Sequence, residues 1–257
     1  MSLNLCVNKA IRAAAGLFLL LVAAQTAQAD GLSDLKLALA KLAGHSTLKA
    51  TVIAKIWNKS GDGKEAKEEQ GQAQVQLIES SQGMQISYGK DLLDKIEGEE
   101  KTKDKRARGV TAALSELQST KLRSLTHAAP ALLRELDKLT FTSEKAEAWN
   151  GKPARLLSFA ADLDKLDESD RKYVKKVDGG LDVWINEAGI PLASRKRFNA
   201  SGRAFVVVSF EAKQDDDEVY VVTGDRLVII RKEEKNVGSG MGERSDRHSV
   251  KTLQIQS

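Results

Sequence analysis

Histidine is the most versatile chemical group in this chain, and it is scarce. The three histidines, His45, His127 and His248, lie far apart in the sequence. None belongs to a His-x-x-x-His or His-x-Glu pattern, the kind of spacing that zinc sites commonly show. His127 lies near the end of a helical stretch, where an imidazole usually interacts with free carbonyl groups. The sequence therefore predicts neither a metal site nor a bound cofactor.

Two short motifs resemble catalytic signatures without meeting their requirements. Ser245, Asp246 and His248 fall within one tetrapeptide, which is too short to place the imidazole between the other two side chains as a hydrolase triad requires. The glycine-rich segment 238–242 lacks both a following helix and the Lys-Ser/Thr of a phosphate-binding loop. We therefore expect a protein that is not an enzyme, although a hydrolase with unrecognised catalytic residues stays open as a third possibility.

An acidic run, Asp215 to Glu218, is a further candidate for ion binding. Consecutive carboxylates could hold calcium weakly, but the spacing of an EF-hand is absent. We expect these residues at a hairpin tip, where charge keeps the turn solvated and blocks pairing with other strands.

Apolar side chains that alternate with period two are the remaining candidates for binding. In a half-buried strand such residues all point to one face, and that face could line a wide aliphatic cavity. The alternative interpretation is that they fill an ordinary core. The candidate cavity residues are Val52, Ile56, Val75, Leu77, Val206, Val208 and Phe210.

The first elements expected around these residues are a helix and a meander. Leucines at helical spacing predict an amphipathic helix over residues 32–42, which Gly44 ends. From Thr47 the period changes to two and predicts a long strand. A charged hairpin tip at 59–70 precedes strands at 72–78 and 84–88.

The middle of the chain is predicted to be helical. Leucine stripes predict helices over 111–127 and 131–138, separated at Pro130. A charge-dense loop is expected at 98–108 and a loose surface helix at 163–177. Asn150-Gly151 is a strong hairpin signal between two strands.

The C-terminal third is predicted to form consecutive hairpins. Residues 180–232 contain four β-rich runs separated by EAGIP, NASGR and KQDDD, segments with the residues that reverse a chain. A flexible loop at 237–247 and a closing strand at 250–255 follow. The predicted fold class is α+β: a single curved antiparallel sheet, a half-barrel of about ten strands, with helices packed on its concave side.

The N-terminus and the composition indicate export. Lys9 and Arg12 precede an apolar run from Ala13 to Ala24, and Ala27-Gln-Ala29 supplies a small-x-small cleavage site. We expect residues 1–29 to be a cleaved signal peptide and 30–257 to be the domain. Cleavage would also remove Cys6, the single cysteine, and with it disulfides, thiolate catalysis and cysteine metal sites.

Charge excludes one class of partner. The net charge is +4 for the whole chain, and removal of two basic residues leaves +2. With 30% charged residues of nearly balanced sign, the surface is solvated and is not typical of nucleic-acid binding. We also expect no transmembrane span in the mature chain, and a monomer.

The order of elements resembles the periplasmic lipoprotein-sorting carriers of the LolA/LolB type. The resemblance rests on TLKATVIAKIW after the first helix, on Trp149-Asn-Gly-Lys-Pro-Ala-Arg155, and on LDVWIN followed by Gly189-Ile-Pro191. It implies an open half-barrel closed by helices, with an apolar cavity for acyl chains. The family's early-strand arginine, which locks its lid, is replaced here by Lys49 and Lys55, so no lid mechanism is carried over.

From these patterns we expect a periplasmic, non-enzymatic protein that binds or carries a lipid tail or a lipoprotein acyl chain. An envelope interaction or sensor module without lipid cargo, which binds a protein partner through a sheet edge or the charged loops, is the alternative hypothesis.

Overall fold

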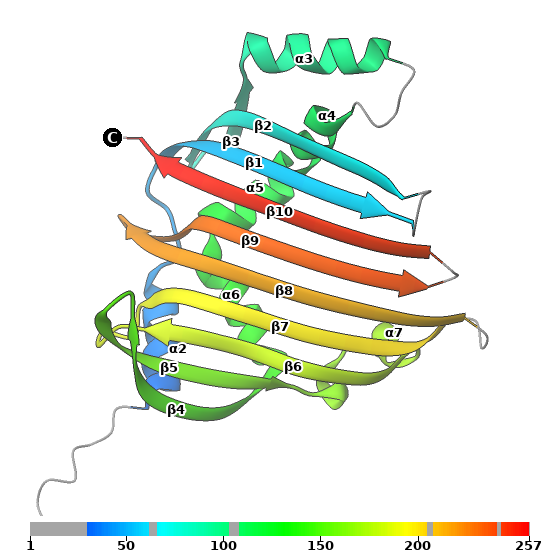
Figure 1. Cartoon of the computed structure of the whole chain (residues 1–257). Helices are drawn as coiled ribbons and strands as arrows, with labels where there is room; N and C mark the ends of the chain where they lie inside the picture. The colour runs from blue at the N-terminus through cyan, green and yellow to red at the C-terminus, as the bar shows by residue number, and fades with distance from the viewer. Residues whose placement is uncertain (1–29, 62–65, 103–107, 205–207, 241–242, 257) are drawn as a thin grey trace, which may run out of the picture. The chain divides into compact units, whose positions relative to one another are not determined.

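Ten antiparallel strands form one open sheet in the computed structural model (Figure 1). The structure describes residues 30–61, 66–102, 108–204, 208–240 and 243–256. The expected signal peptide, residues 1–29, lies outside the described residues. The strand order is β3-β2-β1-β10-β9-β8-β7-β6-β5-β4, so every neighbour is consecutive in the chain except at the pairing of β1 with β10. The predicted fold class is confirmed.

The strands are long and are joined mostly by tight turns. They are β1 Leu48–Ser60, β2 Lys67–Ser80, β3 Gly83–Tyr88, β4 Leu139–Trp149, β5 Lys152–Ala161, β6 Val174–Ile185, β7 Pro191–Ala204, β8 Val208–Thr223, β9 Arg226–Gly240 and β10 Glu243–Ile255. The predicted Asn150-Gly151 hairpin is present, and both residues have positive φ, 50° and 76°, as a two-residue turn of this type requires.

Most of the helices lie on one face of the sheet, which we call the inner face, whereas the helix of residues Lys90–Lys101 lies past the β2–β3 edge (Figure 1). They are α2 Gly31–Lys41, α3 Lys90–Lys101, α4 Gly109–Leu114, α5 Ser119–Thr126, α6 Ala128–Asp137 and the short α7 Glu168–Arg171, with 3-10 turns η3 Ser115–Leu117 and η4 Leu163–Lys165. The single helix predicted over 111–127 is wrong, because the chain becomes extended at Gln118 and divides it. Pro130 lies in the first turn of α6, where its missing N–H costs no helical hydrogen bond.

One hydrophobic core fills the space between the helices and the inner face. Ala50, Val52, Ala54 and Ile56 of β1 all point into it, as their alternation predicts. Leu122 and Leu125 of α5 and Leu132 and Leu136 of α6 cover them from the helix side. In the part of the chain that the structure describes, no helix is long and apolar enough to cross a bilayer.

A buried polar cluster connects the helices on the inner face to one end of the sheet. The Arg226 side chain, which is 2% exposed, donates from Nε to the Ser46 carbonyl at 2.6 Å. Its Nη1 lies 3.0 Å from Nε2 of His127, between α5 and α6, and the same ring nitrogen lies 2.6 Å from Oε1 of Glu79 on β2. This cluster therefore ties β2, β9 and the helix junction together.

Three predicted loops prove to be strand instead. KQDDD and NASGR lie inside β8 and β7 rather than at turns, and β8 turns into β9 at Gly224, whose φ is 58°. The described part of 237–247 belongs to β9 and β10. In the same way Gly98–Lys101 ends helix α3 rather than beginning a loop, and the charged tip after β1 is shorter than predicted because β1 and β2 pair as far as Ser60 and Lys67.

Candidate functional site

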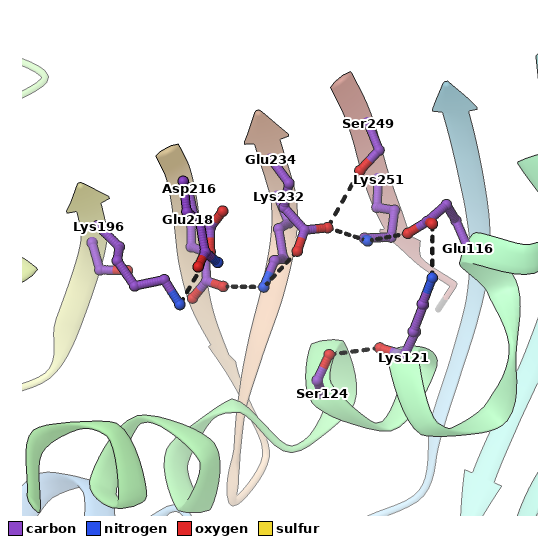
Figure 2. Close-up of polar contacts among 12 residues, drawn as sticks. Glu116, Lys121, Ser124, Lys196, Asp216, Glu218, Lys232, Glu234, Ser249 and Lys251 are labelled. Atoms are coloured by element: carbon purple, nitrogen blue, oxygen red, sulfur yellow. Dashed lines mark hydrogen bonds and ion pairs between the residues drawn. The ribbon is translucent and has the colours of Figure 1, made fainter. Parts of the chain in front are cut away.

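A row of charged side chains crosses the inner face where the helix layer ends (Figure 2). We call it the ionic layer. Six of its members occupy inner-face positions of four adjacent strands, and the seventh is a carboxylate from η3. They are Lys196 of β7, Asp216 and Glu218 of β8, Lys232 and Glu234 of β9, Lys251 of β10 and Glu116 of η3.

The sheet register brings opposite charges next to each other. Lys196 pairs with Asp216 and Glu218 pairs with Lys232, whereas Asp216 and Glu234 are paired carboxylates that Lys196 and Lys232 flank. Cross-strand neighbours of opposite charge attract one another, so the two lysines offset part of the negative charge of the three carboxylates on β8 and β9. The strands can therefore continue through a stretch that is rich in acidic residues.

At the β7 end, Lys196 joins the sheet to helix α6. Its Nζ lies 3.1 Å from Oδ2 of Asp216 and 3.0 Å from Oε1 of Glu135. Burial lowers the pKa of Lys196, but the carboxylates of Glu135 and Asp216 outweigh burial and raise this pKa overall. Burial also raises the pKa of Asp216, more than the neighbouring Lys196 and Lys232 lower it. This contact holds α6 over β7 and β8.

In the centre, two lysines alternate with carboxylates. Lys232 lies 2.8 Å from Glu218 and 3.4 Å from Glu234, and Lys251 contacts Glu234 on its other side. Burial raises the pKa of Glu234, but the ammonium groups of Lys232 and Lys251 outweigh it and lower that pKa. Glu218 also accepts a hydrogen bond from the Tyr220 hydroxyl at 2.6 Å.

At the β10 end, three cations converge on one carboxylate. Glu116, whose side chain is 3% exposed, accepts from Lys251 Nζ at 2.8 Å, from Lys121 Nζ at 2.7 Å and from Arg247. A pocket of about 180 Å³ lies among these groups and reaches Asn236 and Ser249. Burial, together with neighbouring cations, lowers the pKa values of both Lys121 and Lys251. Four of the side chains that line the pocket are basic and two are acidic.

Beyond the ionic layer the inner face is uncovered. In Figure 1, β9 and its neighbours extend past α5 and α6 in the direction of the β9 arrowhead. Two pockets of about 510 and 550 Å³ lie there and share Phe198, Ala200 and Gln214 as lining residues. We call this continuous hollow the trough.

Small and apolar side chains make the trough possible. The inner-face positions of its strands carry Ala200 on β7, Ala212 on β8, Gly238 on β9 and Ser245 on β10, which leave room above the sheet. Leu139, Ala161, Leu166 and Val177 add an apolar wall, while Arg134 of α6 and Lys138, which follows that helix, add two basic side chains.

The structure separates the predicted cavity residues from this trough. Val52, Ile56, Val75 and Leu77 are at most 5% exposed in the packed core beneath the helices, and none of them lines the two trough pockets. Val206 lies outside the described residues. Val208 is described in its backbone alone, as the first residue of β8, and Phe210 is half-buried near Gly202 on β7.

The other sequence candidates do not converge. Ser245 and His248 point to opposite faces of β10, and His248 lies 3.0 Å from Glu233 on the outer face. His45 and Asp225 meet only through backbone donation to the carboxylate. Among the described residues, no group of three or more His, Cys, Asp or Glu side chains could hold a metal ion.

Neither the ionic layer nor the small residues of the trough were predicted from the sequence. The sequence did contain a signal for the ionic layer. In β7 to β10, charged residues of both signs occupy the positions that point to the inner face as well as the alternate positions that point to the outer face.

Compared with known proteins, the chain matches no protein-family model and shows no significant similarity to any curated protein.

Proposed function

We propose that this protein is a periplasmic, non-enzymatic carrier that binds a lipid or lipoprotein acyl chain in the trough. The observation that supports this most is the pair of adjoining pockets on the uncovered half of the inner face, which share Phe198 and Ala200 and of which one is also lined by Ala212. Each has a volume within the roughly 300–1,000 Å³ typical of small-molecule sites. The export prediction and the resemblance to lipoprotein carriers supply the compartment and the ligand class.

Burial of aliphatic surface is the driving force in this proposal. Each buried CH₂ contributes about 0.8 kcal/mol, so about ten methylenes supply roughly 8 kcal/mol before the cost of association. The packed core under the helices stays unchanged, since its apolar side chains already fill it. The ligand therefore adds to the core at its open end instead of opening the helix layer.

Native mass spectrometry of protein purified from its own envelope tests the proposal. We expect a co-purified lipid mass, and we expect the delipidated protein to bind palmitate in a fluorescence displacement assay. Ala200→Trp and Ala212→Trp fill the trough and should weaken palmitate binding at least tenfold. Ala188→Trp, in the exposed turn before β7, is the matched control and should bind as the wild type does.

The alternative is an envelope interaction module without lipid cargo. It is favoured by β4, an edge strand of 11 residues with seven consecutive exposed positions, because unpaired strand edges accept a partner strand. A clean apo mass, with no palmitate binding by any of the variants, would support this module and refute the carrier.

A further inference from the structure

The pocket at the β10 end of the ionic layer has the charge and the size for an anionic group. It is bounded by Glu116, Lys121, Lys232, Glu234, Arg247 and Lys251 and has a volume of about 180 Å³. Four cations thus face two carboxylates, and three carboxylates if Glu218, which also contacts Lys232, is included. The excess lies with Lys121 and Arg247, the two most exposed of the four cations, so it is available to an anion that enters the pocket.

Two lysines of the pocket have lowered pKa values. Lys251 is 4% exposed, and burial and the charges of Lys232 and Arg247 lower its pKa even though Glu234 and Glu116 contact it. Burial and the charge of Lys251 also lower the pKa of Lys121. An anion in the pocket would lie near both ammonium groups and would favour their charged forms.

The pocket also opens into the trough. Asn236 and Arg247 line both the small pocket and the larger trough pocket next to it. The side chains of Lys121 and Arg247 are 38% and 43% exposed, so they have donors available to a ligand that enters from that side. Guanidinium and ammonium groups make their strongest hydrogen bonds with carboxylate or phosphate oxygens.

From this geometry we infer that the trough selects amphiphiles with one anionic group, which is held by Lys121 and Arg247 while the chain lies along Ala200 and Ala212. The inference rests on the proposed function, because it adds the head-group preference to the same acyl-chain site. The shared chemistry is an anionic oxygen group, and either a carboxylate or a phosphate provides it.

The experiment compares three probes with the same alkyl chain: palmitate, hexadecyl phosphate and the neutral hexadecanol. The wild type should bind at least one anionic probe about tenfold more tightly than hexadecanol, since hydrogen bonds to charged groups contribute that much. The double variant Lys121→Gln/Arg247→Gln should lose this preference while its affinity for hexadecanol stays within about twofold. The tighter of palmitate and hexadecyl phosphate identifies the source of the anion.

A charge-matched control distinguishes a local anion-binding site from general electrostatic attraction of the anionic probes to the protein. Arg231→Gln/Lys235→Gln removes two positive charges from the outer face of β9, where both side chains are more than half exposed, and it should keep the anionic preference. Equal binding of all three probes by the wild type would overturn the head-group inference and leave the carrier intact. Loss of the preference in both double variants would also overturn it, whereas no binding of any probe would refute the carrier itself.

Discussion

Lys251 of β10 donates to Glu116 of η3 at 2.8 Å, and both side chains are at most 4% exposed. This pair joins the sheet to the helix layer at the boundary between the packed core and the trough. A buried pair of this kind contributes little compared with an apolar pair of the same size, but removal of one partner leaves an expensive unpaired charge.

The first prediction follows from that asymmetry. Glu116→Gln should lower the free energy of unfolding by about 3 kcal/mol, because Lys251, Lys121 and Arg247 lose a shared carboxylate. The double variant Glu116→Gln/Lys251→Met should recover most of that loss, since it removes the buried ammonium as well. Urea unfolding followed by circular dichroism measures both. A Glu116→Gln protein as stable as the wild type would contradict the importance of the pair.

The second prediction concerns the anchor at the other end of the helix layer. Arg226→Ala should cost about 3–5 kcal/mol, because it leaves the buried Glu79 without its cation and opens a cavity beside His127. Arg195→Ala is the control: it removes an exposed outer-face ion pair with Asp217 and should cost less than about 1 kcal/mol. Equal losses in the two variants would show that Arg226 is not an anchor.

A third prediction tests the close approach of helix α4 to β2. A Cβ atom on Gly71 would lie 1.8 Å from the carbonyl oxygen of Gly109, the first residue of α4. Gly71→Ala should therefore displace the helix and cost about 3 kcal/mol. Gly98→Ala in α3 meets no atom within 4 Å and should gain up to about 1 kcal/mol from helix propensity. The two unfolding midpoints should move in opposite directions.

The fourth prediction is a pH dependence that comes from the outer face. The ammonium of Lys235, together with Arg231 and His248, lowers the pKa of Glu233 from its ordinary 4.5 to about 2. Folding favours the ionised carboxylate, so this contribution is fully present above pH 4.5 and is lost as the pH falls toward 2. Glu233→Gln should reduce the loss of stability between those pH values.

The control for the pH experiment is Glu187→Gln, in the turn before β7. In the described part of the chain, no ion pair or side-chain hydrogen bond involves Glu187. Its pH profile of urea midpoints should superimpose on that of the wild type. Since Glu233 is partly exposed and solvent screens its partners, a small change is expected, and a Glu233→Gln profile identical to the wild type would contradict the assignment.

Much of the fold could be predicted because its signals are local. The alternation of Val52 and Ile56 gives the buried face of β1, and Asn150-Gly151 gives the β4–β5 hairpin from two residues alone. The turn segment EAGIP likewise joins β6 to β7, whereas NASGR and KQDDD lie inside strands.

The ionic layer could not be predicted in that way, because its partners are distant in the sequence. Asp215 to Glu218 has the composition of a turn, yet Asp216 meets Lys196 from β7 and Glu218 meets Lys232 from β9. Such pairing keeps β8 extended only after the register is set. Local propensity therefore favoured a loop at this position, and tertiary contacts overrode it.

The predicted cavity residues show a second limit of prediction from the sequence. Alternation identifies the inner face of Val75 and Leu77 correctly, but it does not tell which half of that face the helices cover. The coverage depends on where α5 and α6 end and on the Lys196–Glu135 contact. The uncovered half is marked instead by small residues such as Ala212 and Gly238, whose meaning depends on what lies above them.

The pairing of β1 with β10 has a consequence for how the molecule is made. Ala50 faces Ile255 where β1 pairs with β10, which joins the three strands β1 to β3 to the other seven, so this seam can close only when β10 has been synthesised. Partners so far apart along the chain form late, because a long loop must be ordered first. Deletion of the 13 residues of β10 would therefore separate β1–β3 from β4–β9 and leave two parts of the sheet with freshly exposed edges, a form prone to aggregate.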